Sequence, residues 1–444
     1  MRQAIASRFL ILLSVFLLIL SAGCESRSTT ANTSPSGSNT SEQKAGEPTE
    51  DAAGKPPADN AAPGATATPA PTAPTAPAAP KDGNAEGAAK PSQAGEPAAQ
   101  EAAVSAVQFI SPTEGWAGGP GAVLHTKDGG VTWEKQYGGS GNVESFSFLN
   151  SSTGWALMRP LQGSGSPAQD GKPAPAVLLH TVNGGAKWTE LTNSAPISKS
   201  FRFISEKEGF SGSRYTSDGG ATWTSLPVPA NIKGEPFYVS KDLGWAVTMK
   251  QPDYQIQLTK DGGKTWKTVW THATVSQVTQ AVIQATNAQD VWVLLIGESG
   301  MSQTSYTLLH SKDEGKAWKT VVAHSTAGGG PAPGYKTEEQ VGPKGPGTKP
   351  GQLVAINSDT AYLFGECPPC GDYGTVSAGW TRDGGTTWTN GEQQIPGLNA
   401  QASFISDKQG FLLAGSSNMT STLYKTEDGG KKWTAVQSFG KKGS

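Results

Sequence analysis

The chain has 444 residues, with 35 lysines and arginines against 37 aspartates and glutamates, for a formal net charge of −2. A balance so close to zero offers no basic field for nucleic acid, so we expect no nucleic-acid partner. Glycine (56 residues) and tryptophan (13 residues) are both abundant, and both recur at fixed positions along the chain.

Residues 1–23 have the pattern of a secretory signal peptide. Arg2 and Arg8 precede the apolar run FLILLSVFLLIL at 9–20. This run is shorter than the roughly 20 residues that a membrane-spanning helix needs. The run ends in LSAGC, which resembles a bacterial lipobox, and this resemblance implies a diacylglycerol on Cys24. The alternative is an ordinary signal peptide with an incidental cysteine. We expect a lipid anchor in the cell membrane, with the protein on its extracytoplasmic face, at the cell surface or in a periplasm.

Residues 24–104 form a linker with an Ala/Pro/Thr-rich composition, as in ATATPAPTAPTAPAAP at 65–80. Almost no aromatic or branched apolar residue interrupts it, so it cannot bury enough surface to fold. The sequence therefore predicts a disordered tether between the lipidated Cys24 and a folded domain at 105–440.

Within that domain an octapeptide typified by TKDGGVTW, residues 126–133, occurs seven times. Each copy has Ser or Thr first, Gly fifth and Trp eighth. Asp or Asn third with Gly behind it is turn chemistry, because the side chain accepts bonds from its own backbone and Gly takes a positive φ. We expect structural rather than catalytic roles for the third residues, which are Asp128, Asn183, Asp218, Asp261, Asp313, Asp383 and Asp428.

A second pattern lies upstream of each octapeptide, as in VQFISPTEGWA at 107–117 and FSFLNSSTGWA at 146–156. An alternating apolar run meets a polar turn and then Gly plus an aromatic residue. IQATNAQDVWVL and VAINSDTAYLF are degenerate versions. Short apolar runs also precede and follow every octapeptide, with no helical period. Four antiparallel strands per unit and seven units predict an all-β, seven-bladed β-propeller.

The octapeptide Ser/Thr-x-Asp-x-Gly-x-x-Trp resembles the Asp-box, or bacterial neuraminidase repeat, of sialidases and of several non-enzymatic propellers. The fuller unit, with its G-W-A segment, resembles the photosystem II assembly and stability factor family over residues 105–440. That resemblance implies a protein that binds partner proteins, often through an arginine-rich face. The propeller region of this chain has four arginines in three separate blades, namely Arg159, Arg202, Arg214 and Arg382.

The sialidase resemblance implies three arginines that converge on a carboxylate, a Tyr–Glu nucleophile pair and an acid/base Asp. Arg202 lies in a first strand where other repeats have Gln108 or Ser147, and Arg382 lies inside an octapeptide. Such arginines do not readily converge. The sequence therefore favours a non-catalytic protein without a cofactor, and a secreted, sialidase-like glycoside hydrolase is the alternative.

Histidines and cysteines are the candidate metal ligands and redox groups. His125, His180 and His310 occupy equivalent positions in different blades and therefore radiate apart, so we expect no metal site. Cys367-Pro-Pro-Cys370 predicts a local disulfide in an oxidising compartment, with redox activity and metal ligation as alternatives.

Four long loops carry the remaining functional signal, and all are links on the face opposite the octapeptides: 159–176, 297–305, 325–351 and 365–376. Loops gathered on one face of a propeller are typical of a binding face. Its expected residues are Arg159, Tyr335, Glu366, Asp372 and Tyr373. We expect a monomeric binding or assembly module, tethered to a membrane, whose partner is a protein or a cell-surface glycan.

Overall fold

A computed structural model describes residues 102–160, 176–191, 197–335, 342–416 and 419–440. The predicted signal peptide, Cys24 and nearly all of the linker lie outside the described residues, as do parts of the loops 159–176 and 325–351. The described residues form strands and no helix, and so include no helix that could cross a membrane.

The first sheet has the strand order β1-β2-β3-β4-β5-β6, with β1 (Ala106–Phe109), β2 (Gly115–Thr126), β3 (Glu134–Phe148), β4 (Gly154–Pro160), β5 (Val177–Thr181) and β6 (Thr189–Leu191). The second sheet contains β7 (Arg202–Phe203), β8 (Gly209–Ser211), β9 (Arg214–Thr216) and β10 (Thr224–Ser225). The third contains β11 (Phe237–Tyr238), β12 (Gly244–Lys250), β13 (Asp253–Thr259) and β14 (Lys267–Ala273).

The fourth sheet contains β15 (Gln280–Ala285), β16 (Val291–Ser299), β17 (Thr304–Ser311) and β18 (Lys319–His324). The fifth contains β19 (Lys349–Ala355), β20 (Ala361–Cys367), β21 (Thr375–Thr381) and β22 (Thr389–Asn390), and β23 (Ile395–Pro396) also pairs with β21. The sixth contains β24 (Leu398–Phe404), β25 (Gly410–Gly415), β26 (Ser421–Thr426) and β27 (Thr434–Phe439).

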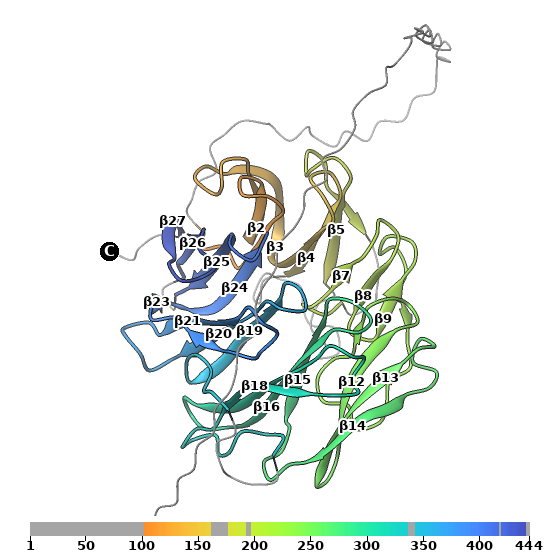
Figure 1. The fold of residues 1–444 in the computed structure, drawn as a ribbon. Coiled ribbons are helices and arrows are strands. Elements are labelled where there is room, and N and C mark those ends of the chain that lie inside the picture. The colour runs from red at the N-terminus through yellow and green to blue at the C-terminus, as the bar shows by residue number, and fades with distance from the viewer. Residues whose placement is uncertain (1–101, 161–175, 192–196, 336–341, 417–418, 441–444) are drawn as a thin grey trace, which may run out of the picture. The chain divides into compact units, whose positions relative to one another are not determined.

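These sheets form a closed ring, which Figure 1 shows around a common centre. First strands of neighbouring sheets contact one another, as β15 contacts β19 and β19 contacts β24. The ring closes where β1 contacts β24 and β25, and one apolar core includes residues from both ends of this chain segment. The prediction of an all-β propeller with four-stranded antiparallel blades is confirmed.

The predicted number of seven blades is wrong, because the structure has six sheets. The difference lies in the first sheet, which contains two of the octapeptides. Strand β3 pairs with β2 through its first part and with β4 through residues 141–148. The segment GGSGN at 138–142, which has the composition of a link between blades, remains extended and paired. Its small residues allow the backbone to continue as one long strand.

The Gly-aromatic pattern reflects a close contact between two neighbouring strands of a sheet. Phe148 is opposite Gly154 across the ladder, and a Cβ atom on Gly154 would lie 2.2 Å from the Phe148 ring. Where the ring is missing, the glycine is missing too, since Ala355 is opposite Ala361. The same ring–glycine pairing recurs at Phe109 and Gly115, Phe203 and Gly209, Tyr238 and Gly244, and Phe404 and Gly410.

Polar side chains on the first strands of most sheets, and on the end of β3, join neighbouring repeats around the ring. The Gln108 amide accepts from the Phe148 backbone N–H at 2.9 Å and donates to its carbonyl. Arg202 occupies the matching position and donates to the carbonyl of Tyr238. Its guanidinium therefore has a structural role in the ring, in keeping with the inference that Arg202 is one variant of a repeated position. The other links of this kind join Ser147 to Phe203, Gln284 to Ala355, Gln352 to Ala402, and Ser403 to Phe109.

Candidate functional site

Five of the seven octapeptides connect the third strand of a sheet to its fourth, and the two in the first sheet connect β2 to β3 and β5 to β6. Together they define the turn face of the ring. In the copy at 381–388, Thr381 donates its hydroxyl to Asp383 Oδ1 at 2.9 Å and accepts from the Gly385 N–H at 2.8 Å. Asp383 also accepts from the backbone and the hydroxyl of Thr387. These bonds lower the pKa of Asp383 to about 2, the backbone bond contributing most.

The other third residues accept hydrogen bonds in the same way from within their own turns, and they are Asp128, Asn183, Asp218, Asp261, Asp313 and Asp428. Each carboxylate or amide is thus used by its own backbone, and the turns belong to different repeats. The arrangement stabilises hairpins and brings no two of these acids to a shared reaction centre.

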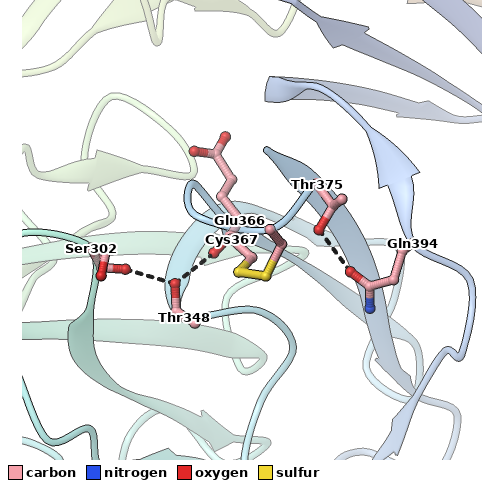
Figure 2. The surroundings of a disulfide bond; sticks show 7 residues. Ser302, Thr348, Glu366, Cys367, Thr375 and Gln394 are labelled. Atoms are coloured by element: carbon pink, nitrogen blue, oxygen red, sulfur yellow. Dashed lines mark hydrogen bonds between the residues drawn. A yellow bond between two sulfur atoms is a disulfide. The ribbon is translucent and has the colours of Figure 1, made fainter. Parts of the chain in front are cut away.

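On the opposite face, three of the four long loops meet. The Thr348 hydroxyl donates to the carbonyl of Ser302 at 2.7 Å, and its backbone N–H donates to the carbonyl of Glu366 at 2.8 Å. The Thr304 N–H donates in turn to the Thr348 carbonyl at 2.9 Å. Figure 2 shows Thr348 between Ser302 and Glu366. We call residues 300–304, 347–349 and 366–375 the loop cluster.

A disulfide lies within the loop cluster. Cys367 is the last residue of β20, and it is bonded to Cys370 with Cα atoms 5.4 Å apart. Cys367 is buried and Cys370 is partly exposed. Figure 2 shows the sulfur–sulfur bond beside Glu366 and Thr375. The bond closes the start of the link between β20 and β21, so that the rest of this link projects from a fixed base.

Three predicted site residues share that link or its base. The Glu366 carboxylate accepts from the Asn399 N–H at 2.7 Å and is therefore tied to the sixth sheet. Asp372 is exposed, and Tyr373 is 44% exposed. An acidic group and an aromatic ring are thus presented together at the tip.

Arg159 and Tyr335 are not among the residues of the loop cluster, and their polar groups bond to other parts of the chain. Arg159 pairs with Glu144 at 2.7 Å and donates to the carbonyl of Ile197. The Tyr335 hydroxyl donates to Thr320 Oγ1 at 2.6 Å, and burial raises the pKa of this phenol. We infer from these contacts that both residues support loops locally.

Sequence reasoning missed two exposed apolar residues on the same face. Met301, at the tip between β16 and β17, is 101% exposed, and Met419, between β25 and β26, is 82% exposed. Together with Tyr373 they place one large apolar side chain on the matching hairpin of each of three consecutive sheets. We call these three residues the apolar tips. No sequence signal marks Met301 and Met419, because the exposure of a methionine in a polar loop depends on how the neighbouring loops pack.

The described residues contain no cluster of three or more potential metal ligands. His125, His180 and His310 stack separately on Trp116, Trp155 and Trp292. The arginines do not converge either, since Arg382 donates to carbonyls of Asp407 and Gly429 on the turn face. No arrangement of the sialidase kind is formed by the described residues.

The sheets define this chain as a β-propeller, with the hydrogen-bonded loop cluster on one face. No family model and no curated protein matches the sequence. Among solved structures it is similar to YCF48 bound to D1 peptide, at 18% identity over 75% of this chain and 96% of that one, with a TM-score of 0.45.

Two further similar structures are enzymes. A polysaccharide lyase of family PL25, an ulvan lyase, shows 10% identity over 77% of this chain and 95% of that one, with a TM-score of 0.36. A GH93 alpha-L-arabinofuranosidase of Fusarium graminearum with arabinobiose shows 11% identity over 66% and 81%, with a TM-score of 0.30. The propeller assignment rests on the strand topology of this chain itself, and the repeat-level resemblance to a family stays a prediction.

Proposed function

We propose that this chain is a non-catalytic binding or assembly module whose loop cluster takes a protein partner, while a lipid on Cys24 and the linker hold it at a membrane outside the cytoplasm. The observation that carries the proposal is the row of apolar tips, Met301, Tyr373 and Met419, on hairpins of three consecutive sheets. Exposed apolar groups gathered on one face are typical of interaction sites.

The loops that carry Met301 and Tyr373 have a fixed base, which favours tight recognition. Backbone and hydroxyl bonds of Thr348 hold the loops at 302 and 366 together, and the disulfide closes the adjoining link. A partner then loses little loop entropy on binding. The acidic Asp372 beside Tyr373 adds a polar contact at the rim.

A protein partner suits these tips better than a glycan does. Methionine is a flexible apolar side chain that adapts to apolar side chains of a partner. Recognition of a sugar ring relies on flat aromatic faces, and Tyr373 is the one aromatic residue among the apolar tips. We therefore propose that the loop cluster binds a protein. A cell-surface glycan is the alternative ligand that the experiment below distinguishes.

The test is affinity capture from the native host with the full-length chain, followed by measurement of Kd with the identified partner. The double variant Met301→Ser, Met419→Ser should weaken binding by about tenfold or more. Val131→Ser with Val182→Ser is the matched control, because these side chains are 59% and 66% exposed on the turn face. Equal weakening by both pairs would refute the assignment, and capture that resists protease but not glycosidase would identify a glycan.

The anchor is tested independently. Mass spectrometry of the mature N-terminus should find a diacylglycerol on Cys24, and Cys24→Ala should abolish it and release the protein from membranes. Unmodified Cys24 on the wild-type protein would end the lipid-anchor proposal and would leave the loop-cluster proposal intact.

A further inference from the structure

The turn face contains a groove of about 730 Å³ in the first sheet, between the octapeptides at 126–133 and 181–188. This groove is on the opposite face from the loop cluster, so a ligand bound in it would be independent of the proposed function. Its lining includes Glu114, His125 and Lys127 from one repeat and Asn183 from the next. Two departures from the repeat pattern coincide here.

The first departure is Gln136, three residues after the octapeptide tryptophan. Matching positions in other repeats hold apolar residues such as Leu191 and Val321, and Val321 packs against the fifth-position glycine Gly385 of the following octapeptide. Gln136 instead accepts from Trp116 Nε1 at 3.1 Å and donates to the Gly184 carbonyl at 2.8 Å. A polar amide therefore occupies a seam that is apolar elsewhere.

That amide changes the hydrogen bonding of a buried histidine. In the repeat of His310, Nε2 is bonded to Asp290 at 2.6 Å and Nδ1 to the Gly384 carbonyl at 3.0 Å. Gly184 is the counterpart of Gly384, and Gln136 already uses its carbonyl. His125, 5% exposed, keeps the acid contact, from Nε2 to Glu114 at 3.1 Å. Its Nδ1 has no hydrogen-bond partner among the described residues.

The protonation of His125 follows from its surroundings. Burial lowers its pKa, against the opposing effect of the Glu114 hydrogen bond, so the ring is neutral at pH 7. Because Glu114 accepts, the proton lies on Nε2, and Nδ1 is left as an acceptor. A ligand in the groove would therefore need a hydrogen-bond donor at this point.

The second departure is Asn183, the one amide among the seven third residues. Its Oδ1 accepts from the Thr181 hydroxyl at 3.0 Å and from the Lys187 N–H at 2.9 Å. The Nδ2 group of Asn183 is therefore a hydrogen-bond donor. In four other turns the matching atom is a carboxylate oxygen, which accepts from a threonine hydroxyl. Lys127 and Lys135 also line the groove, and neither has an ion-pair partner in the described part of the chain.

We propose that this groove binds a small zwitterion, a free amino acid or a dipeptide, with its ammonium group on His125 Nδ1 and its carboxylate on Asn183 Nδ2, Lys127 and Lys135. The described lining contains no exposed aromatic face of the kind a sugar stacks on. Glu114 and Glu134 add negative charge that suits the ammonium group. Both departures from the repeat are explained by one ligand.

Calorimetric titration of the full-length chain with glycylglycine tests the proposal, and ¹⁵N NMR of the histidine rings locates the contact. Glycylglycine should bind and shift His125 Nδ1, whereas N-acetyl-glycylglycine and glycylglycine amide, which lack one charge each, should bind at least about tenfold more weakly. A longer peptide has its two charged ends farther apart and should bind more weakly than glycylglycine, so tighter binding of a longer peptide would overturn the two-ended contact. Equal affinity for all three dipeptides, or no binding by glycylglycine, would overturn the proposal.

Two variants retain the fold by copying other repeats. Gln136→Leu reproduces Leu191 and should free the Gly184 carbonyl for His125, so binding is lost while the protein stays folded. Trp116 Nε1 loses its acceptor in this variant, and the Nε1 atoms of Trp245 and Trp292 are already buried without a partner in the described part of the chain. Asn183→Asp restores the common turn residue and should weaken glycylglycine about tenfold by placing a carboxylate beside the ligand carboxylate. Wild-type affinity in both variants would place the ligand elsewhere.

Discussion

The rings of Phe109 in β1 and Phe411 in β25 stack with centroids 3.5 Å apart and planes 8° apart. These strands belong to the first and the last sheets, and the Phe109 N–H also donates to Ser403 Oγ at 2.9 Å. Each of these two sheets takes all its strands from its own end of the domain. Side-chain contacts between the two sheets therefore close the ring.

Removal of the Phe411 ring should open this seam. We expect Phe411→Ala to lower the free energy of unfolding by about 3–5 kcal/mol, since a fully buried aromatic side chain is replaced by a cavity. Phe411→Leu keeps most of the volume and should cost clearly less. Urea unfolding followed by tryptophan fluorescence measures both, and equal stabilities of the two variants would contradict closure by ring stacking.

Gly154 provides a test of strand packing. A Cβ at this position would lie 2.2 Å from the Phe148 ring, so Gly154→Ala should lower the melting temperature by several degrees. Gly138→Ala is the control, because its Cβ would meet nothing closer than the flexible end of Lys135 at 3.4 Å. In the background of Phe148→Ala the cost of Gly154→Ala should largely disappear, as in the Ala355–Ala361 pair. Additive costs in the double variant would be inconsistent with the contact.

The octapeptide acids should contribute to folding and leave ligand binding unchanged. Asp383→Ala removes an acceptor from the Thr387 N–H and hydroxyl, which should cost about 1–2 kcal/mol of stability. Asp383→Asn should cost less, since Asn183 already supports such a turn. Thermal unfolding and the Kd for the partner decide whether Asp383 acts in folding or in binding. A lost affinity at an unchanged melting temperature would assign Asp383 to binding.

The same acids predict an acid-labile fold. The Thr387 backbone bond and then its hydroxyl lower the pKa of Asp383 to about 2, and the hydroxyl and backbone bonds of Thr265 lower that of Asp261. A carboxyl whose pKa is lower in the folded state stabilises the fold above its unfolded pKa of about 3.9, and this contribution is lost as pH falls through the folded pKa. Stability should thus decline from about pH 4 towards pH 2. The difference between wild type and Asp383→Asn, measured by urea unfolding, should shrink over that range; a constant difference would argue against it.

The disulfide should stabilise the loop cluster more than the ring. The bond spans three residue positions, and closing so short a loop contributes about 2 kcal/mol or less. We expect Cys370→Ser to leave the propeller folded and to speed hydrogen exchange at Asp372 and Tyr373, with Cys367→Ser behaving alike. Global unfolding of either variant, or unchanged hydrogen exchange at Asp372 and Tyr373, would show that the disulfide does not act mainly on the loop cluster.

Local chemistry made much of this fold predictable. The octapeptides carry their turn geometry in the sequence, because Thr381 and Asp383 satisfy a hairpin without help from other parts of the chain. The blade count was less accessible. Residues 138–142 have the composition of a loop, and only the pairing of β3 with both β2 and β4 keeps them extended.

The candidate site was predictable in part for the same reason. Cys367 and Cys370 are close in sequence, so their pairing is a local matter. The meeting of Thr348 with Ser302 joins loops of different sheets, and the exposure of Met301 depends on how those loops pack. Gln136 has the pattern of an ordinary strand residue, and its difference shows only when the matching seams are compared.

Closure by packing also fixes when the ring can form during synthesis. Among the described strands, the one that contains Phe109 is the first to leave the ribosome, and its partner Phe411 emerges 302 residues later. Until β25 emerges, the face of the Phe109 ring that stacks on Phe411 is exposed to whatever surrounds the growing chain. The ends of the domain are then adjacent, since a Cβ on Gly440 would lie 3.4 Å from the Ala103 nitrogen. A circularly permuted chain, joined there and opened between two other sheets, would move that late closing step to a different seam.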